Sequence, residues 1–307
     1  MKLFVPNVDN SVFILLMLIR GGDLLSDLAY TVKQRQKDIR YIGVSLSLKS
    51  LFIIIICLVA NIQANMAIDH FLIGILLITT IFFAIDLKTS IRSFSFKTDY
   101  IKRITILTTP LALASLVNSV NANIPRYLLD FYYDKTSVAI FSTFFFFYSS
   151  IIIITNSFIQ VSLNKLSLSL NSQVETRKMI KSYIIFAFMT SLSFILFNEL
   201  IGQFIYNLIF GTKYTEYAHY LHYLNIIIPQ AIAIIMINYF VIALRSYKTS
   251  FLFTSLTLIV HFAVAMVLIK GSEIEGSFDA FIIAQAFYII INIVFITKKV
   301  RELRHEF

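Results

Sequence analysis

The stretch SVAIFSTFFFFYSSIIIITNSFIQVS, residues 137–162, contains no charged side chain and is long enough to cross a lipid bilayer as one helix. Eight further apolar runs have a similar length, at about 11–32, 41–61, 66–86, 104–125, 182–200, 222–244, 250–269 and 279–297. The runs are continuous and lack the polar alternation of a membrane-spanning strand. We therefore predict an all-α, polytopic transmembrane helical bundle with about nine spans.

The composition favours the same fold class. Of the 307 residues, 58% are hydrophobic and only 14% are charged, and the mean hydropathy is +0.80. A water-soluble domain cannot hide so much apolar side chain, because its surface must be wetted. The single cysteine, Cys57, lies inside an apolar run, so we expect neither a disulfide framework nor a cysteine-based metal site.

The basic residues are distributed unevenly between the two sets of alternate loops. Nineteen of the 26 Lys and Arg residues fall in one set, at 33–40, 88–103, 165–181, 245–248 and 298–304. The positive-inside rule places that set in the cytoplasm, with the N-terminus outside and the C-terminus inside. The net charge of +9 then reflects topology and contact with anionic lipid, and we expect no nucleic-acid partner.

Two motifs on opposite predicted faces of the membrane carry a family resemblance. They are LTTPLALASLVNSVNANIPRYLLDFYYDKTSVAIFSTFFFF, residues 107–147, and SDLAYTVKQRQKDIRYIGVSLSLKS, residues 26–50. The first has an early proline, an Asn-Ile-Pro-Arg-Tyr segment, an acidic residue and the start of a new helix: Pro110, residues 123–127, Asp130 and residues 139–141. In these features the chain resembles the flippases that export O-antigen and capsule repeat units, within the multidrug/oligosaccharidyl-lipid/polysaccharide exporter superfamily.

The resemblance implies a fold of two six-helix lobes, of which this chain matches only part. Residues 102–307 correspond to a C-terminal six-helix lobe with a basic cytoplasmic tail. Residues 1–101 correspond to a partial N-terminal lobe of three helices and a basic linker, so about three helices of the family have no counterpart in this sequence. Loss of an odd number of helices moves the N-terminus outside, which agrees with the charge distribution.

The resemblance also implies a function, namely a transporter that flips undecaprenyl-diphosphate-linked oligosaccharide repeat units across the bacterial cytoplasmic membrane. The implied partners are membrane lipid, the lipid-linked oligosaccharide and other polysaccharide assembly proteins. No nucleotide-binding or catalytic-triad motif is apparent in the sequence, so we expect no cofactor and no enzymatic activity. The alternatives are a membrane-embedded polymerase or acyltransferase of the same pathway, a multidrug exporter, and an inactive truncated flippase.

The first predicted span carries a polar stripe, made of Arg20, Asp23, Asp27, Tyr30 and Gln34 at helical spacing. Charge inside a membrane is costly and usually faces a partner or an aqueous cavity. One interpretation is a cavity wall in which Arg20 contacts substrate and Asp23 or Asp27 couples an ion. The other is a self-neutralising Arg20–Asp23 pair, with Asp27 bonded to a neighbouring helix.

Two further basic residues are candidate substrate contacts. Lys49 lies roughly 12 Å into the second span, where it can either extend to the cytoplasmic interface or contact a diphosphate. Arg126 follows Pro125, which we expect to end or kink the helix, and its guanidinium can bind phosphate or a sugar carboxylate. The alternative is an Arg126–Asp130 pair within an aromatic interfacial belt.

Neutral polar residues complete the predicted substrate site. Asn123 and Tyr127 lie beside Arg126, and Asn156 and Gln160 share one face of the fifth span. Later spans contain amides at Gln230, Asn238, Gln285 and Asn292. Each of these side chains can line a cavity or hydrogen-bond to a neighbouring helix.

Overall fold

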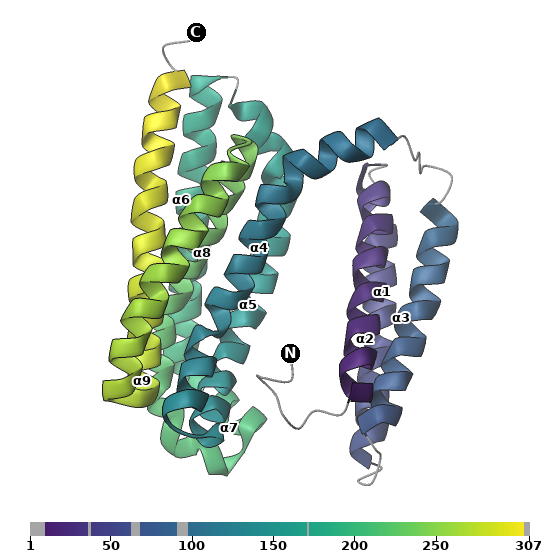
Figure 1. Cartoon of the computed structure of the whole chain (residues 1–307), viewed down its shortest axis with the longest axis vertical. Coiled ribbons are helices and arrows are strands. Elements are labelled where there is room, and N and C mark those ends of the chain that lie inside the picture. Colours follow the sequence, from purple (N-terminus) through teal and green to yellow (C-terminus); the bar gives the residue numbers. More distant parts are fainter. Residues whose placement is uncertain (1–9, 36–37, 63–67, 91–97, 171, 304–307) are drawn as a thin grey trace. The chain divides into compact units, whose positions relative to one another are not determined.

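The structure is a computed structural model that describes residues 10–35, 38–62, 68–90, 98–170 and 172–303 (Figure 1). The described secondary structure is entirely helical, with no strand in those ranges, which confirms the predicted all-α polytopic bundle. The chain divides into two compact units, residues 1–100 (unit 1) and 101–307 (unit 2).

Unit 1 consists of three long helices, α1 (Asn10–Arg35), α2 (Ile39–Ile62) and α3 (Ile68–Ser90). The most extensive contact in the unit is between α1 and α3, and α2 packs against α3 as well. Most of the apolar side chains on α2 and α3 remain exposed, as expected of helices that face lipid.

Unit 2 contains six long helices, because α9 doubles back on itself. Its elements are α4 (Thr98–Tyr132), α5 (Lys135–Ser169), α6 (Gln173–Phe197), a π-helical turn (Asn198–Gly202), α7 (Gln203–Phe210), a 3-10 helix (Thr212–Tyr220), α8 (Leu221–Ala243) and α9 (Tyr247–Leu303). The central helix is α8, which packs against α5, α6 and α9 and has the largest buried share. By contrast, α4 has the least extensive contacts with the rest of unit 2.

The core of unit 2 is rich in aromatic rings near the predicted outer end of the helices. Phe144 stacks on Tyr206 with ring centroids 5.0 Å apart and meets Phe278 edge-on at 5.6 Å. The Tyr206 hydroxyl, which is fully buried, lies 3.0 Å from the Thr143 hydroxyl and so keeps a hydrogen-bond partner. This cluster ties α5, α7 and α9 together.

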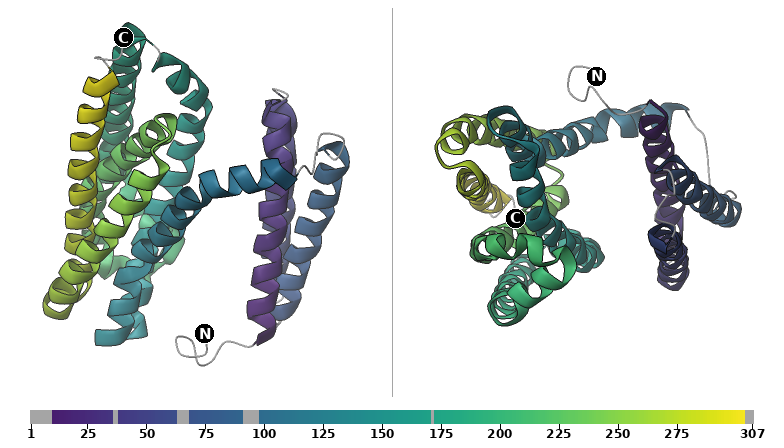
Figure 2. Two further views of the ribbon diagram at one scale, coloured as in Figure 1. Left: turned by 45° about the horizontal axis from the view of Figure 1, so that its top comes forward. Right: turned by 90° about the horizontal axis from the view of Figure 1, so that it is seen from below.

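The reversal within α9 takes place at two residues. Ser272 has φ −135° and ψ 15°, and Glu273 has the positive φ of 50°, so the helical path is broken there. The chain then passes close to itself, because a Cβ on Gly276 would lie only 2.2 Å from the Leu268 carbonyl oxygen. The two arms of α9 lie side by side in Figures 1 and 2, and they contain the predicted spans 250–269 and 279–297.

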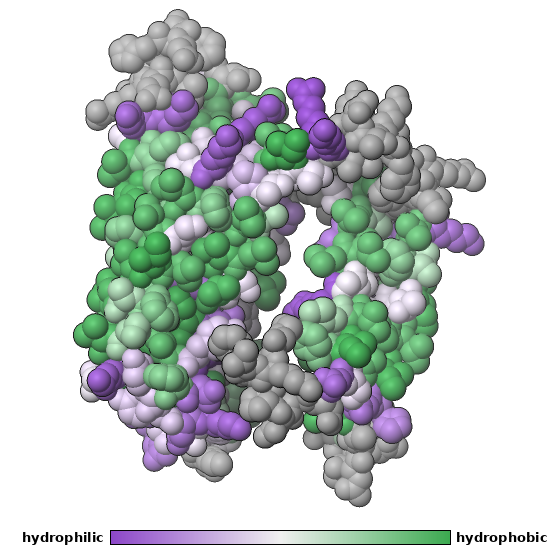
Figure 3. All heavy atoms as spheres, viewed as in Figure 1, coloured by the Kyte–Doolittle hydropathy of each residue, from purple (hydrophilic) through white to green (hydrophobic). Residues whose placement is uncertain are grey.

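Seven segments of the described chain are long and apolar enough to cross a membrane: Arg40–Ala60, Ile68–Lys88, Lys102–Tyr132, Lys135–Gln160, Val174–Phe210, Tyr214–Ala243 and Tyr247–Lys299. The last segment accounts for two of the nine predicted spans. Helix α1 is not among the seven, because every membrane-length stretch of it contains Arg20, Asp23 and Asp27. In Figure 3 the middle parts of the helices are apolar at the surface, and hydrophilic residues gather toward their ends.

The turn between α4 and α5 lies later than we predicted. Pro125 does not end the helix, since α4 continues to Tyr132, and Arg126 is therefore a helical residue. Asp134 caps α5 by accepting a hydrogen bond from the Ser137 backbone N–H at 2.8 Å and another from its hydroxyl at 2.9 Å. The hydrogen bonds from Ser137 hold the pKa of the Asp134 carboxyl below its ordinary value.

Candidate functional site

In unit 1, Asp23 and Lys49 form an ion pair across α1 and α2. The Lys49 ammonium donates to Asp23 Oδ1 at 2.5 Å, and its side chain is only 10% exposed, against 32% for Asp23. Arg20 is 83% exposed and lies 3.9 Å from Asp23. The Arg20–Asp23 pair is therefore the weaker contact, and Lys49 does not extend to the interface but is held by a carboxylate.

The remaining members of the predicted stripe have different environments. Asp27 is exposed, and its carboxylate has no hydrogen bond or ion pair within the part of the chain that the structure describes. Tyr30 is buried, with its hydroxyl 3.0 Å from the Ser45 hydroxyl. The side chain of Gln34 lies outside the described residues. The stripe thus does not form one continuous polar wall.

Unit 1 also contains a buried carboxylate that the sequence did not single out. Asp86 on α3 is fully buried and accepts hydrogen bonds from the Tyr41 hydroxyl at 2.9 Å and the Ser45 hydroxyl at 3.1 Å. Together with Tyr30, these groups connect all three helices of unit 1. The signal in the sequence is a lone acidic residue within the apolar run IFFAIDL.

In unit 2, Arg126 is half-buried and is held by neutral groups. Its Nη1 donates to Asn123 Oδ1 at 2.7 Å and its Nε donates to Ser142 on α5 at 3.2 Å. The guanidinium carbon lies 4.3 Å from the ring centre of Phe145. The predicted Arg126–Asp130 pair is not formed, and no carboxylate pairs with Arg126 among the described residues.

The other predicted contacts are separated from one another. Tyr127 is 60% exposed and does not join the cluster around Arg126. Gln160 is exposed, whereas Asn156 on the same helix lines a cavity inside unit 2. The structure therefore brings Asn123 to Arg126, and Lys49 and Arg20 to Asp23, but it does not gather the predicted residues of unit 2 into one site.

The cavity has a volume of about 340 Å³ and lies between α4, α5, α8 and both arms of α9. Its polar lining consists of Asn118, Asn121, Tyr148, Asn156, Asn238, Thr257, Gln285 and Tyr288. None of the described residues that line the cavity is charged. Amides and phenols of this kind both donate and accept hydrogen bonds, so the cavity suits water or neutral hydroxyl groups.

Some hydrogen-bonding groups around this cavity are satisfied within the protein and others are not. Tyr288 donates to Asn238 at 2.6 Å, and His261 Nδ1 lies 2.8 Å from Asn121 Oδ1. Among the described residues, no hydrogen-bond partner reaches the buried Oε1 of Gln285 or the buried Nε2 of His261. Unsatisfied buried polar atoms are costly, so a bound polar molecule at Gln285 would lower the energy of the site.

The described residues contain no group of three His, Cys, Asp or Glu side chains that could hold a metal ion. The geometry thus defines a polytopic helical membrane protein with charged groups inside both units and a neutral polar cavity in the second.

Comparison with known proteins adds one relative. No protein-family model matches the chain, and no solved structure matches it. The chain is 25% identical over 221 residues to the capsular polysaccharide biosynthesis protein CapF of Staphylococcus aureus, a match that covers 68% of this chain and 55% of CapF. The chain therefore spans about half the length of that relative. The similarity supports a relation to capsule biosynthesis for a protein built of membrane-length helices.

Proposed function

We propose that this chain belongs to a transporter that flips undecaprenyl-diphosphate-linked oligosaccharide repeat units across the cytoplasmic membrane during surface polysaccharide assembly. A diphosphate and several sugars cannot cross hydrocarbon unaided, because each unsatisfied polar group costs several kcal/mol there. A transporter must supply polar and cationic partners inside the membrane. The similarity to a capsular polysaccharide biosynthesis protein favours this substrate class.

Arg126 is the observation on which the proposal mainly rests. A guanidinium inside an apolar helix is costly, and such residues commonly mark a substrate pathway. Here the surrounding groups are Asn123, Ser142 and the face of Phe145, which orient the side chain without neutralising it. An oriented guanidinium without a carboxylate partner is suited to bind a phosphate through two parallel hydrogen bonds.

Lys49 and Asp23 supply a way to couple binding to an ion. While Asp23 is ionised, the Lys49 ammonium is occupied by the carboxylate at 2.5 Å. Protonation of Asp23, or binding of a cation to it, removes this competitor and frees Lys49 for the diphosphate. Lys49 then exchanges one anionic partner for another, so that substrate binding and ion binding at Asp23 favour each other.

The experiment that tests this proposal replaces Arg126 in cells whose own copy of the gene has been deleted. We expect Arg126→Gln to abolish surface polysaccharide and to cause lipid-linked repeat units to accumulate. Arg126→Lys keeps the positive charge but cannot form bidentate hydrogen bonds to a phosphate, so this variant should retain partial export. Arg103→Gln is the matched control, because Arg103 is an exposed basic residue of the same helix.

Membrane levels of each variant are measured by immunoblotting. Normal export by Arg126→Gln at an unchanged protein level would show that Arg126 does not contact the substrate. The proposal would then lose its main support.

A further inference from the structure

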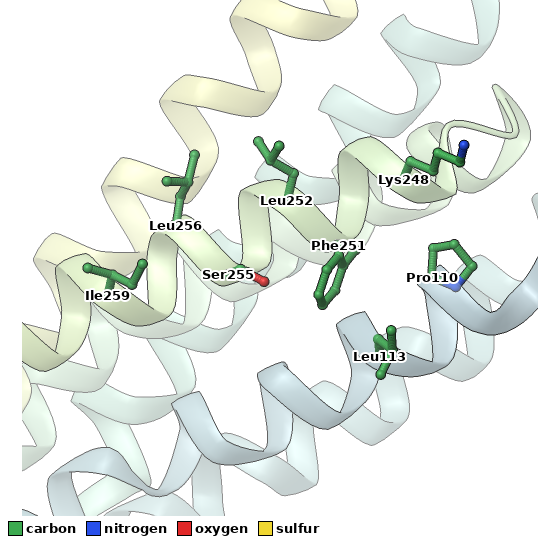
Figure 4. Close-up of a pocket in the computed structure, with 8 residues that line it drawn as sticks. All are labelled: Pro110, Leu113, Lys248, Phe251, Leu252, Ser255, Leu256 and Ile259. Carbon is green, nitrogen blue, oxygen red and sulfur yellow. The ribbon is translucent and has the colours of Figure 1, made fainter.

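A second feature of unit 2 is a groove between α4 and the first arm of α9, where α4 packs loosely. The groove has a volume of about 580 Å³, and Pro110 and Leu113 on α4 form one wall. Figure 4 shows Phe251 directed toward Leu113, with Lys248 and Pro110 at one end of the groove and Ile259 at the other. Apart from Lys248 and Ser255, the side chains that line it are apolar.

The dimensions of the groove correspond to one leaflet of a bilayer. From Lys248 to Ile259 the helix advances eleven residues, or about 16 Å. Half of the hydrocarbon core of a bilayer is about 15 Å thick. A single chain of a lipid can therefore lie along the groove from the interface to the middle of the membrane.

The charge of the groove is positive and confined to one end. Lys248 is exposed, and no carboxylate pairs with it in the described ranges. Arg245, in the turn before α9, is also exposed, but it is not among the described residues that line the groove. The sequence contains no Asp or Glu from residue 217 to residue 272, so nothing on α8 or on the first arm of α9 offsets these charges.

We propose that this groove is a specific binding site for an anionic phospholipid of the leaflet that contains Lys248. The phosphate head group lies against the Lys248 ammonium, and one acyl chain lies along Phe251, Ser255 and Ile259 opposite Leu113. An amphiphile with a single anionic end matches a groove that is one leaflet long and charged only at one end. The site does not depend on the transport function proposed above.

The absence of tryptophan from the sequence allows a site-specific test. Phe251→Trp places the sole tryptophan of the chain in the groove, and Leu192→Trp places it at a lipid-exposed position of α6 as a control. Each purified protein is reconstituted into vesicles of phosphatidylcholine with brominated phosphatidylglycerol or brominated phosphatidylcholine. Quenching of the tryptophan by each brominated lipid gives the relative affinity of the two lipids at that position.

We expect the tryptophan at position 251 to show a preference for phosphatidylglycerol of about fivefold, the contribution of one basic residue near a membrane surface. The preference at position 192 should be close to one. Adding Lys248→Gln should abolish the preference at position 251, whereas Lys178→Gln, which removes an exposed lysine of α6, should leave it unchanged. Equal preferences at positions 251 and 192, or a preference that survives Lys248→Gln, would overturn the proposal.

Discussion

Replacing either partner of the Asp23–Lys49 ion pair should destabilise unit 1, but by different amounts. Lys49→Met leaves the Asp23 carboxylate with only the exposed Arg20 guanidinium, 3.9 Å away, whereas Asp23→Leu removes the carboxylate that pairs with the buried Lys49 ammonium. The two residual charges differ in their access to solvent, because the Asp23 side chain is 32% exposed and the Lys49 side chain only 10%. The charge that remains more deeply buried carries the larger penalty.

The magnitudes follow from that difference in exposure. Removing one partner of a fully buried ion pair costs about 3–5 kcal/mol, and exposed pairs contribute about 0–1 kcal/mol. We therefore expect about 2–4 kcal/mol for Asp23→Leu and about 1–2 kcal/mol for Lys49→Met. The double variant leaves no buried unpaired charge, because the remaining Arg20 is 83% exposed. Its loss of stability should therefore be smaller than the sum of the losses in the two single variants.

Hydrogen exchange of the protein in nanodiscs, followed by mass spectrometry, measures the local stability of each unit separately. Peptides from α1, α2 and α3 should exchange about 5–30 times faster in Lys49→Met, and faster still in Asp23→Leu. Peptides from α8, in unit 2, serve as the internal control. Unchanged exchange in unit 1, or the reverse order of the two single variants, would refute the reasoning from burial.

Two further predictions concern the topology and the cap of α5. A reporter that is active only outside the cytoplasm should be inactive when fused after Phe307 and active when inserted within 270–278, and the opposite pattern would reverse the predicted orientation. The lowered pKa of Asp134 means that its cap contributes fully above the ordinary value of 3.8 and is lost as the pH falls through the lowered value. Backbone amides at the start of α5 should therefore lose protection against hydrogen exchange at acidic pH, after correction for intrinsic exchange rates. The variant Asp134→Asn keeps a capping oxygen that does not titrate, so it should remove this pH dependence.

The positions of the helices were largely predictable from the sequence. A continuous apolar run of membrane length is expected to be a helix, because a bilayer provides no hydrogen-bond partners for free backbone groups. The two spans within α9 were predicted as well, but the segment that joins them was predicted as a loop, because it contains Lys270, Gly271 and Gly276. In the structure the helix resumes almost at once, because Gly276 permits a close approach to Leu268.

The partners of the charged residues were not predictable. Spacing within one helix favoured Arg20–Asp23 and Arg126–Asp130, whereas the shortest contacts of Asp23 and part of those of Arg126 are made with other helices. Such contacts depend on the rotation and register of neighbouring helices, which a single sequence does not specify. The same reason explains why Asp86 and the amides around Asn121 did not stand out as members of buried polar groups.

The most direct test of the proposed transport function is the location of lipid-linked repeat units in cells that lack this gene. A membrane-impermeant reagent that oxidises sugars, applied to intact spheroplasts, distinguishes units that face outward from units that face the cytoplasm. We expect complete lipid-linked repeat units to accumulate facing the cytoplasm, and to become accessible when the gene is restored. Incomplete units would instead indicate an enzyme of repeat-unit assembly, and complete units that already face outward would indicate a later step; either result would contradict a flippase.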